Sequence, residues 1–506
     1  MTVVTTVDPR NGRSLFTGLH ETDDAELASA LVASAAAFEW LRGLSRHDRA
    51  DLLDRIAAEL ESRRAELVAF AESETGLTRA RLDGELTRAA FQFRLFGEVL
   101  REGGYLEAAI DHVAQTPLGP APDLRRMLVP LGPVAVFGAS NFPFAFSVAG
   151  GDTASALAAG CPVVVKAHPS HPLTSQLSAE TIAAAISAHS GPPGVLTVVY
   201  GQEAGLALVR HPGVRAAALT GSTAAARAIQ SAIDERDEPI PFYGELSSVN
   251  PIVVLPAAAA ARAEQIAAGL FASFTGSGGQ LCTKPGLAFV PSGPAGDRLV
   301  GSLRDQVAAA DSQVLLNARI RDTYVAGGER LVAAGAQRTA RAANNTAAGF
   351  VGAPTLLELD LERFGAEHTE ECFGPLLVVV RYADAAKLEG VLSGLPGSLT
   401  GSIHAEPADD RALVRRVVDV LAAGAGRIVF DGYPTGLRVS WAQHHGGPWP
   451  ATNSVHTSVG ATAIRRFLRP LAWQDAPEWI LPDELAEGFD AIPRRVDGAL
   501  RPGHHS

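Results

Sequence analysis

The stretch "GPVAVFGASNFPFAF", residues 132–146, changes within a few positions from an apolar run to glycine, serine, asparagine and proline. It predicts a short buried strand that ends near Phe137 and is followed by a turn. Four later segments follow the same pattern: "CPVVVKAH" (161–168), "VLTVVYG" (195–201), "VRAAALTGS" (214–222) and "VNPIVVLP" (249–256). Alanine-rich segments of helical character separate them. This alternation of strand and helix predicts a doubly wound parallel sheet.

The pattern continues in both directions from this region. The segments "PGLAFV", "FGPLLVVVRY" and "GRIVF", near residues 288, 378 and 428, start or end similar units, so we expect a second α/β domain after residue 245. Upstream, residues 24–103 carry apolar side chains at a spacing of three to four, which predicts helices. A proline-rich connector follows, with a strand expected at residues 125–129. From residue 470 the chain is expected to be irregular.

Bulk properties restrict the class of protein. The 506 residues exceed what one hydrophobic core supports, so two or three domains are expected. The formal charge of −12 argues against a nucleic-acid partner, which needs clustered basic residues. Three widely spaced cysteines form neither a disulfide framework nor a zinc pattern, and the N-terminus has no signal-peptide pattern, so a cytoplasmic location is expected. Residues 132–151 carry no charge, but Asn141, Pro143 and four glycines argue against a membrane span.

Two polar side chains follow the first two predicted strands. An asparagine at a strand end, such as Asn141, can donate to a developing oxyanion, although a turn asparagine beside proline is the simpler interpretation. Lys166 ends the apolar run "CPVVVK", where a nucleotide ribose or phosphate would lie in such a sheet. His168 and His171 have the spacing of metal ligands, but the prolines that follow each of them favour loop histidines. We therefore predict no metal site.

Later strand ends carry further candidates. Gly221 and Ser222 precede an alanine-rich helix and suit a pyrophosphate, or simply cap the helix. Glu245 lies 37 residues before Cys282. A thiolate attacks a carbonyl carbon, and a carboxylate can activate the water that later releases an acyl group. The alternatives are a buried structural cysteine and a glutamate paired with arginine. Lys284, beside the cysteine, is interpreted as a solvated or structural lysine.

Taken together, the motifs resemble those of the aldehyde dehydrogenase superfamily from the early helices to about residue 475. The matching segments are "NFPF", "PVVVKAHPSHP", "TGSTAAAR", "GELSSVNP", "GGQLCTKPG" and "EECFGP". Within the superfamily, "ELSSVNP", "KAHPSHP", the segment from "HHGGPWP" to "WQDAPE" and the closing "RRVDG" resemble the 2,5-dioxopentanoate (α-ketoglutaric semialdehyde) dehydrogenase branch. That branch lies close to certain NADP-dependent fatty aldehyde dehydrogenases.

The resemblance implies an α/β fold with two parallel-sheet domains, one for the cofactor and one for catalysis, and a small β oligomerisation element. The implied boundaries are 1–116 and 132–244 for the cofactor-binding domain, 245–461 for the catalytic domain, 117–131 and 462–500 for the oligomerisation strand and C-terminal segment, and 501–506 for a tail. A homodimer or homotetramer is expected. Cys161 and Cys372 match no family role and are expected in or near the core.

The resemblance also implies a mechanism. Cys282 attacks the aldehyde carbon, and the side chain of Asn141 and the Cys282 backbone N–H hold the oxyanion of the thiohemiacetal. Hydride passes to the nicotinamide and leaves a thioester. Glu245 then deprotonates the water that hydrolyses this thioester to a carboxylate.

Further residues match the family's cofactor site. Lys166 matches the adenosine-ribose lysine, and the remaining matches are Gly221 and Ser222 for the pyrophosphate, Glu371 and Phe373 for the nicotinamide ribose and ring, and Phe137, Leu246 and Ser170. NAD-preferring members carry a glutamate three residues after the lysine, where this chain has Pro169. No carboxylate there repels a 2′-phosphate, so NADP is expected, with NAD as the alternative.

The substrate branch implies a cationic or hydrogen-bonding end to the substrate tunnel. Arg438, His444 and Phe142 are the candidates, with a surface role for Arg438 and a packed loop position for His444 as alternatives. A medium- or long-chain aliphatic aldehyde is the alternative substrate. Two rivals of other classes are a catalytically silent scaffold and a cysteine hydrolase. The first is disfavoured because all three catalytic positions are kept, the second because no histidine lies in a matching motif.

Overall fold

The computed structural model describes residues 2–343 and 348–503, so residues 504–506 of the expected tail lie outside the described residues. After a hairpin of β1 (Val3–Asp8) and β2 (Arg13–His20), the predicted helical region is confirmed. It consists of α1 (Asp24–Gly43), α2 (Arg46–Ser62), α3 (Arg64–Thr75) and α4 (Arg79–Glu102). Gly76 ends α3 in the left-handed conformation, at φ 64°, which glycine adopts without steric cost.

The first sheet contains five parallel strands in the order β11-β10-β7-β8-β9. Its strands are β7 (Val134–Phe137), β8 (Val163–Lys166), β9 (Leu196–Val199), β10 (Ala216–Thr220) and β11 (Phe242–Glu245). The helices between them are α5 (Gly151–Ala159), α6 (Pro172–Ala188), α7 (Gln202–Arg210) and α8 (Thr223–Asp234). The strand order reverses beside β7, and such sheets bind ligands at this reversal, beyond the carboxyl ends of the strands.

The second sheet has seven strands in the order β15-β17-β18-β13-β12-β19-β20. They are β12 (Ile252–Val254), β13 (Leu287–Pro291), β15 (Gln337–Arg341), β17 (Thr355–Asp360), β18 (Leu376–Tyr382), β19 (Ser398–His404) and β20 (Ala425–Phe430). All pairings are parallel except the edge pair of β15 and β17. The accompanying helices are α9 (Pro256–Thr275), α10 (Pro294–Ala309), α11 (Ala318–Ala333), α12 (Ala385–Ser393) and α13 (Arg411–Gly424). The two predicted parallel-sheet layers are confirmed.

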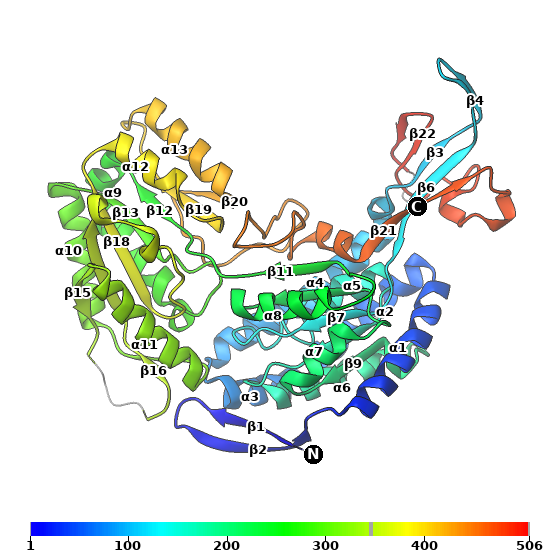
Figure 1. The fold of residues 1–506 in the computed structure, drawn as a ribbon, viewed down its shortest axis with the longest axis horizontal. Helices are drawn as coiled ribbons and strands as arrows, with labels where there is room; N and C mark the ends of the chain where they lie inside the picture. The colour runs from blue at the N-terminus through cyan, green and yellow to red at the C-terminus, as the bar shows by residue number, and fades with distance from the viewer. Residues whose placement is uncertain (1, 344–347, 504–506) are drawn as a thin grey trace.

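A third sheet, in the order β21-β6-β3-β22-β23, forms an arm that projects from the two α/β layers (Figure 1). It consists of β3 (Ala109–Asp111), β6 (Leu124–Pro130), β21 (Leu468–Gln474), β22 (Arg494–Val496) and β23 (Ala499–Arg501). The expected strand at residues 125–129 is present as β6. Because β3 pairs with β6, this sheet begins before the expected boundary at residue 116.

One expectation about this arm is wrong. The chain from residue 470 was expected to be irregular, but β21 pairs with β6 over seven residues. β21 is an edge strand of its sheet. Proline lacks an N–H, and an edge strand tolerates it because one side of that strand has no neighbour to which an N–H would donate. Pro470 therefore does not break the strand.

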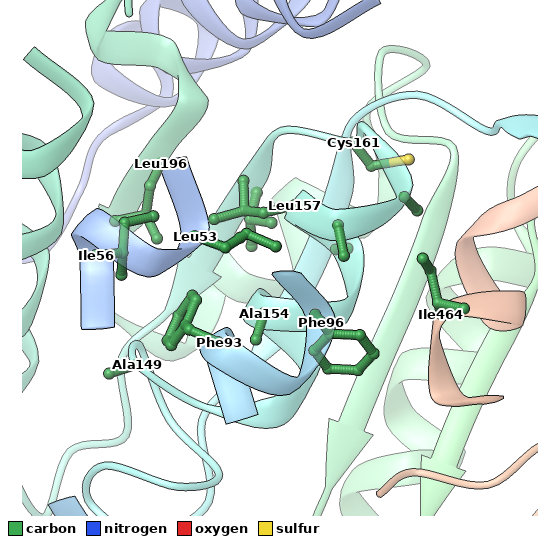
Figure 2. Close-up of a cluster of buried hydrophobic side chains, with 14 of the residues drawn as sticks. Leu53, Ile56, Phe93, Phe96, Ala149, Ala154, Leu157, Cys161, Leu196 and Ile464 are labelled. Atoms are coloured by element: carbon green, nitrogen blue, oxygen red, sulfur yellow. The ribbon is translucent and has the colours of Figure 1, made fainter. Parts of the chain in front are cut away.

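The helices α2, α4 and α5 pack around a large hydrophobic core beside the first sheet. Figure 2 shows Leu53, Phe93, Leu157 and Ile464 gathered in this core, with Cys161 at its margin. Cys161 is fully buried, and burial raises the pKa of its thiol to about 11. Cys372 is also buried, in the core of the second sheet. The prediction that both are core residues is confirmed.

The uncharged stretch 132–151 forms strand β7, a turn and the first residue of α5, as the glycines and proline predict. Within residues 2–343 and 348–503, no helix has the length and apolarity needed to cross a membrane.

Candidate active site

The predicted site residues come from the carboxyl edge of the first sheet and the amino edge of the second. Asn141 follows β7 and Glu245 ends β11, both at the carboxyl edge of the first sheet. Cys282 precedes β13 and Glu371 precedes β18, both at the amino edge of the second sheet. Figure 1 shows β11 leading from one layer towards the other. The edges meet where the Asn141 side-chain amide donates to the backbone oxygen of Gln280, at 2.8 Å.

The loop that carries Cys282 is held by backbone contacts. Gly279 has a φ of 65°, and a Cβ there would lie 2.3 Å from the backbone of Gly374, so only glycine allows this approach to the "EECFGP" segment. On the other side, the Asn250 amide donates to the backbone oxygens of Cys282 and Lys284, at 2.8 and 3.0 Å. The position of the thiol is therefore set by residues on both sides of its loop.

Lys284 belongs to this support. It is 1% exposed, and its Nζ donates to the backbone oxygens of Cys372 and Leu376, at 3.0 and 3.1 Å. The structural interpretation of Lys284 is thus confirmed, and the solvated one is wrong, because the ammonium is enclosed and has backbone partners.

Three side chains converge at the centre of the site. The Nε2 of His445 lies 2.8 Å from Oε1 of Glu245 and 3.6 Å from Sγ of Cys282. The Ser458 hydroxyl donates to the other carboxylate oxygen of Glu245, at 2.5 Å. Glu245 and His445 are buried, whereas Cys282 is partly exposed. The carboxylate oxygen of Glu245, the sulfur of Cys282 and the ring nitrogen of His445 lie within 4.8 Å of one another, an arrangement that could also hold a metal ion.

The charges at this centre favour a carboxylate beside a protonated thiol. Burial raises the pKa of Glu245, but the charge of His445 and the hydrogen bonds from His445, Ser458 and Cys282 outweigh it, so the net shift is downward. Burial and the charge of Glu245 raise the pKa of the Cys282 thiol well above its usual range. The thiol therefore needs a proton acceptor before it can attack, and the adjacent carboxylate of Glu245 is the candidate for this acceptor.

His445 is the residue of this centre that the sequence failed to single out. The prediction named its neighbour His444, and no spacing linked either to a cysteine 163 residues away along the chain. Its position depends on a loop closure: the backbone N–H of His445 donates to the Thr457 hydroxyl, and the N–H of Ser458 donates to the His445 oxygen. The one available signal was the doublet "HH" inside a segment that matches the branch.

Two donors stand ready for an oxyanion near the thiol. The Asn141 side chain is buried and uses one N–H on Gln280, which leaves the second. No hydrogen bond joins the Cys282 backbone N–H to another residue in the described ranges. The structure thus brings Asn141, Glu245 and Cys282 together, as the motifs predict.

The predicted cofactor residues at the first sheet lie at adjacent strand ends. Phe137 and Lys166 pair across β7 and β8. Burial lowers the pKa of Lys166, and the charge of Glu21 opposes this shift. Ser222 caps α8 and accepts from the N–H of Ala225, at 3.2 Å. This helix start and the enclosed ammonium suit the phosphates and ribose of a dinucleotide.

Two predicted cofactor residues are already hydrogen-bonded to other groups of the chain. The Gly221 N–H donates to the backbone oxygen of Glu245, at 2.9 Å, and so belongs to the sheet. Ser170 is buried, and its hydroxyl accepts from the Asn317 amide, at 2.9 Å, in a contact with the second layer. Neither group is free to face a phosphate in this arrangement.

The remaining cofactor candidates lie at the second edge and beside Glu245. Burial raises the pKa of Glu371 to about 7, although the charge of Lys284 and hydrogen bonds from Ser247 and Ser248 act against it. Phe373 is partly exposed, and Leu246 is buried directly after Glu245. Glu371 is partly exposed, and a carboxylate there can also accept from the hydroxyls of a ribose.

The three substrate candidates separate in the structure. Phe142 is partly buried and packs on Phe146 near the catalytic centre, with ring centroids 5.2 Å apart. His444 is partly buried, and burial lowers its pKa. Arg438 is exposed, with no hydrogen bond or ion pair to the rest of the described chain. The exposure favours the surface interpretation of Arg438.

The chain belongs to the aldehyde dehydrogenase family, whose model matches residues 2–428. It is therefore an NAD(P)-dependent oxidoreductase that converts an aldehyde to a carboxylate, as the resemblance predicts. The chain is 44% identical over 502 residues, 97% of this chain and 95% of the relative, to alpha-ketoglutaric semialdehyde dehydrogenase 2 of Azospirillum brasilense. It is 41% identical over 484 residues, 94% of this chain and 91% of the relative, to alpha-ketoglutaric semialdehyde dehydrogenase of Acinetobacter baylyi.

Solved structures agree on the fold. The chain superposes on a 1-pyrroline-5-carboxylate dehydrogenase of Thermus thermophilus with a TM-score of 0.80 and 22% identity, covering 93% of this chain and 89% of that one. A putative aldehyde dehydrogenase of Burkholderia cenocepacia gives a TM-score of 0.79 at 23% identity, covering 94% and 96%. The predicted fold class is confirmed.

Proposed function

We propose that the chain oxidises 2,5-dioxopentanoate, the semialdehyde of α-ketoglutarate, to 2-oxoglutarate, with NADP favoured over NAD. The observation that carries the reaction type is the buried centre of Cys282, Glu245 and His445 beside two oxyanion donors. The substrate follows from the two relatives that match nearly the whole chain. The proposed assembly is a homodimer or homotetramer, with the arm of β6 and β21 as its contact element.

The first half of the reaction uses Cys282, Asn141 and Glu245. The thiol proton passes to the carboxylate of Glu245, which becomes neutral. The Nε2–H of His445, which donates to that carboxylate while it is ionised, then turns to the thiolate 3.6 Å away and stabilises it. The thiolate forms a bond to the aldehyde carbon, and the carbonyl electron pair becomes an oxyanion. Asn141 and the Cys282 backbone N–H hold this oxyanion, each donor contributing about 2.7–4 kcal/mol in related sites.

The second half releases the acid. A nicotinamide held by Glu371 and Phe373 would supply the hydride acceptor for the thiohemiacetal carbon, so that the acyl group would remain on Cys282 as a thioester. Glu245, once its proton has passed to solvent, takes a proton from water, and the water oxygen bonds to the thioester carbon. The C–S bond then breaks, which frees the carboxylate product and the Cys282 thiolate. Hydrogen bonds from Ser458 and His445 hold Glu245 in the ionised form that this step needs.

The cofactor preference rests on the surroundings of Lys166. Pro169 stands at the position where a carboxylate would repel a 2′-phosphate, and the Lys166 ammonium is mostly enclosed at the end of β8. A 2′-phosphate would supply this ammonium with an anionic partner. Equal or higher catalytic efficiency with NAD would contradict the preference.

An aliphatic aldehyde is the second candidate substrate. The apolar cluster of Leu95, Ala139, Ala145, Phe146, Val439 and Val459 includes a ring, that of Phe146, 6.4 Å from the ring of His445, so apolar side chains border the catalytic centre. An assay of cofactor reduction with 2,5-dioxopentanoate, succinic semialdehyde, pentanal and decanal, each with NAD and NADP, separates the two candidates. The highest kcat/KM is expected for 2,5-dioxopentanoate with NADP. Activity confined to the long aliphatic aldehydes would refute the proposed substrate.

His445 is expected to stabilise the thiolate of Cys282 rather than to act as the proton acceptor. In His445→Ala, alkylation of Cys282 by iodoacetamide at pH 7 should slow by about tenfold or more, because the thiolate loses a donor. His445→Gln should recover part of the rate, since its amide also donates. Cys161 and Cys372 are buried, so alkylation reports Cys282. An unchanged alkylation rate in His445→Ala would contradict this role.

A further inference from the structure

Arg88, on the inner part of α4, carries a guanidinium that its surroundings do not satisfy. Its Nε and Nη2 are fully enclosed and make no hydrogen bond to any residue in the described ranges. Arg81 lies seven residues earlier on the same helix and differs from Arg88. It donates to Ser277, Glu85 and the backbone oxygen of Asn141. Leaving a buried charged donor without a partner is unfavourable, so the position of Arg88 suits an anionic partner.

Among the described residues, no carboxylate forms an ion pair with Arg88. Glu85 is the acidic residue next to it on the same helix, but Oε1 of Glu85 accepts from the backbone N–H groups of Phe144 and Ala145. Its Oε2 is paired with Arg81, at 2.8 Å. Glu85 thus holds the "NFPF" loop in place and is already fully engaged.

The guanidinium lies beside the catalytic centre. It sits 4.9 Å from the ring centroid of Phe146 and 5.6 Å from that of Phe142. The Phe146 ring is in turn 6.4 Å from the ring of His445, centroid to centroid. Burial lowers the pKa of Arg88, and the nearby charges of Cys282, Glu85 and Glu245 act in the opposite direction. A buried cation therefore lies on the aromatic side chains that border the catalytic centre.

Arg427 is the other arginine whose charge acts on Cys282. Two of its nitrogens already donate to the backbone oxygens of Pro434 and Gly436. Its guanidinium therefore supports a loop, and Arg88 keeps more unused donors.

We propose that Arg88, which lies on the rings of Phe142 and Phe146 beside the catalytic centre, binds the carboxylate of the aldehyde substrate. This inference rests on the proposed function, because it requires an aldehyde that carries an acid at its far end. A carboxylate accepts two parallel N–H bonds from a guanidinium, which satisfies the buried donors and fixes the far end of the substrate. An aldehyde that carries an acid would pair with Arg88, whereas a neutral aldehyde would leave it unpaired.

The test compares substrates that differ in the acid. Arg88→Met keeps the length and the apolar packing of the side chain but removes the charge. We expect kcat/KM for 2,5-dioxopentanoate and succinic semialdehyde to fall by about 10²-fold or more, mainly through KM, because a buried charge pair is lost. For pentanal, kcat/KM should stay within about threefold or rise. Arg88→Lys should recover only part of the loss, since a single ammonium does not make the paired contact.

An inhibition measurement accompanies the substrate comparison. Glutarate should compete with the aldehyde in the wild type and lose this competition in Arg88→Met. Equal losses for acidic and neutral aldehydes in Arg88→Met would overturn the inference, and so would a selective loss in Arg438→Ala with none in Arg88→Met. If the wild type itself prefers pentanal to both acids, the proposed function fails first. If the wild type prefers the acids and Arg88→Met keeps that preference, only the role of Arg88 fails.

Discussion

Replacing Cys282 by alanine is expected to abolish aldehyde oxidation, with a loss of about 10⁶-fold, which is the scale seen when a catalytic nucleophile is removed. No other side chain at the centre can form the covalent intermediate, because Glu245 and His445 are held in hydrogen bonds and the other two cysteines are buried elsewhere. The measurement is NADP reduction with 2,5-dioxopentanoate over hours, at high enzyme concentration.

The matched control for this variant is Cys372→Ala. Cys372 lies in the core of the second sheet, and burial raises the pKa of its thiol to about 11, so it is inert at neutral pH. Cys372→Ala should keep most of its activity with a small loss of stability. Binding of NADP, followed by fluorescence or calorimetry, should be unchanged within a few fold in Cys282→Ala. Oxidation by Cys282→Ala within 10²-fold of the wild type would refute the covalent mechanism.

Replacing Glu245 by glutamine is expected to separate the two halves of the reaction. A single burst of reduced cofactor should still appear, because Cys282, Asn141 and His445 remain. Steady turnover should fall by about 10²- to 10⁴-fold, since no carboxylate is left to deprotonate the water. The burst itself should be slower than in the wild type, because the thiol loses its proton acceptor.

Rapid-mixing kinetics and mass spectrometry of the quenched enzyme check this prediction. The acyl-enzyme should accumulate on the peptide that contains Cys282. Ser458→Ala is the matched control: it keeps the carboxylate and removes one of its hydrogen bonds, so it should lower turnover by far less. Steady turnover of Glu245→Gln at the wild-type rate would assign the water activation to another group, with His445 next in line.

Much of the fold could be predicted because its signals are local. The apolar runs that end at Phe137 and Lys166 are strands, and the residues between 24 and 103 are helical, since periodicity reports burial along one element. The arm was harder. β3 and β21 are separated by more than 350 residues and meet through β6, and no local pattern states such a pairing.

The site divides in a similar way. Asn141, Glu245 and Cys282 lie in motifs whose order along the chain is specific, so a resemblance identifies them. Arg88 lies in no motif and is one of many arginines on helices. What distinguishes it is that two of its buried nitrogens have no hydrogen-bond partner among the described residues. The predicted cofactor roles of Gly221 and Ser170 could not be judged from the sequence. In the folded chain the Gly221 N–H and the Ser170 hydroxyl already hydrogen-bond to residues that are distant in the sequence.

The sequence by itself determined the class of fold and the family and predicted the nucleophile, because these depend on periodicity and on the order of short motifs. Only the tertiary structure decided which histidine reaches the sulfur and which arginine is left unpaired beside it. His445 lies 200 residues from Glu245 along the chain and 2.8 Å from it in space. Hydrogen bonding and desolvation act over a few ångströms, so the chemistry of such a centre depends on packing between segments that are distant in the sequence.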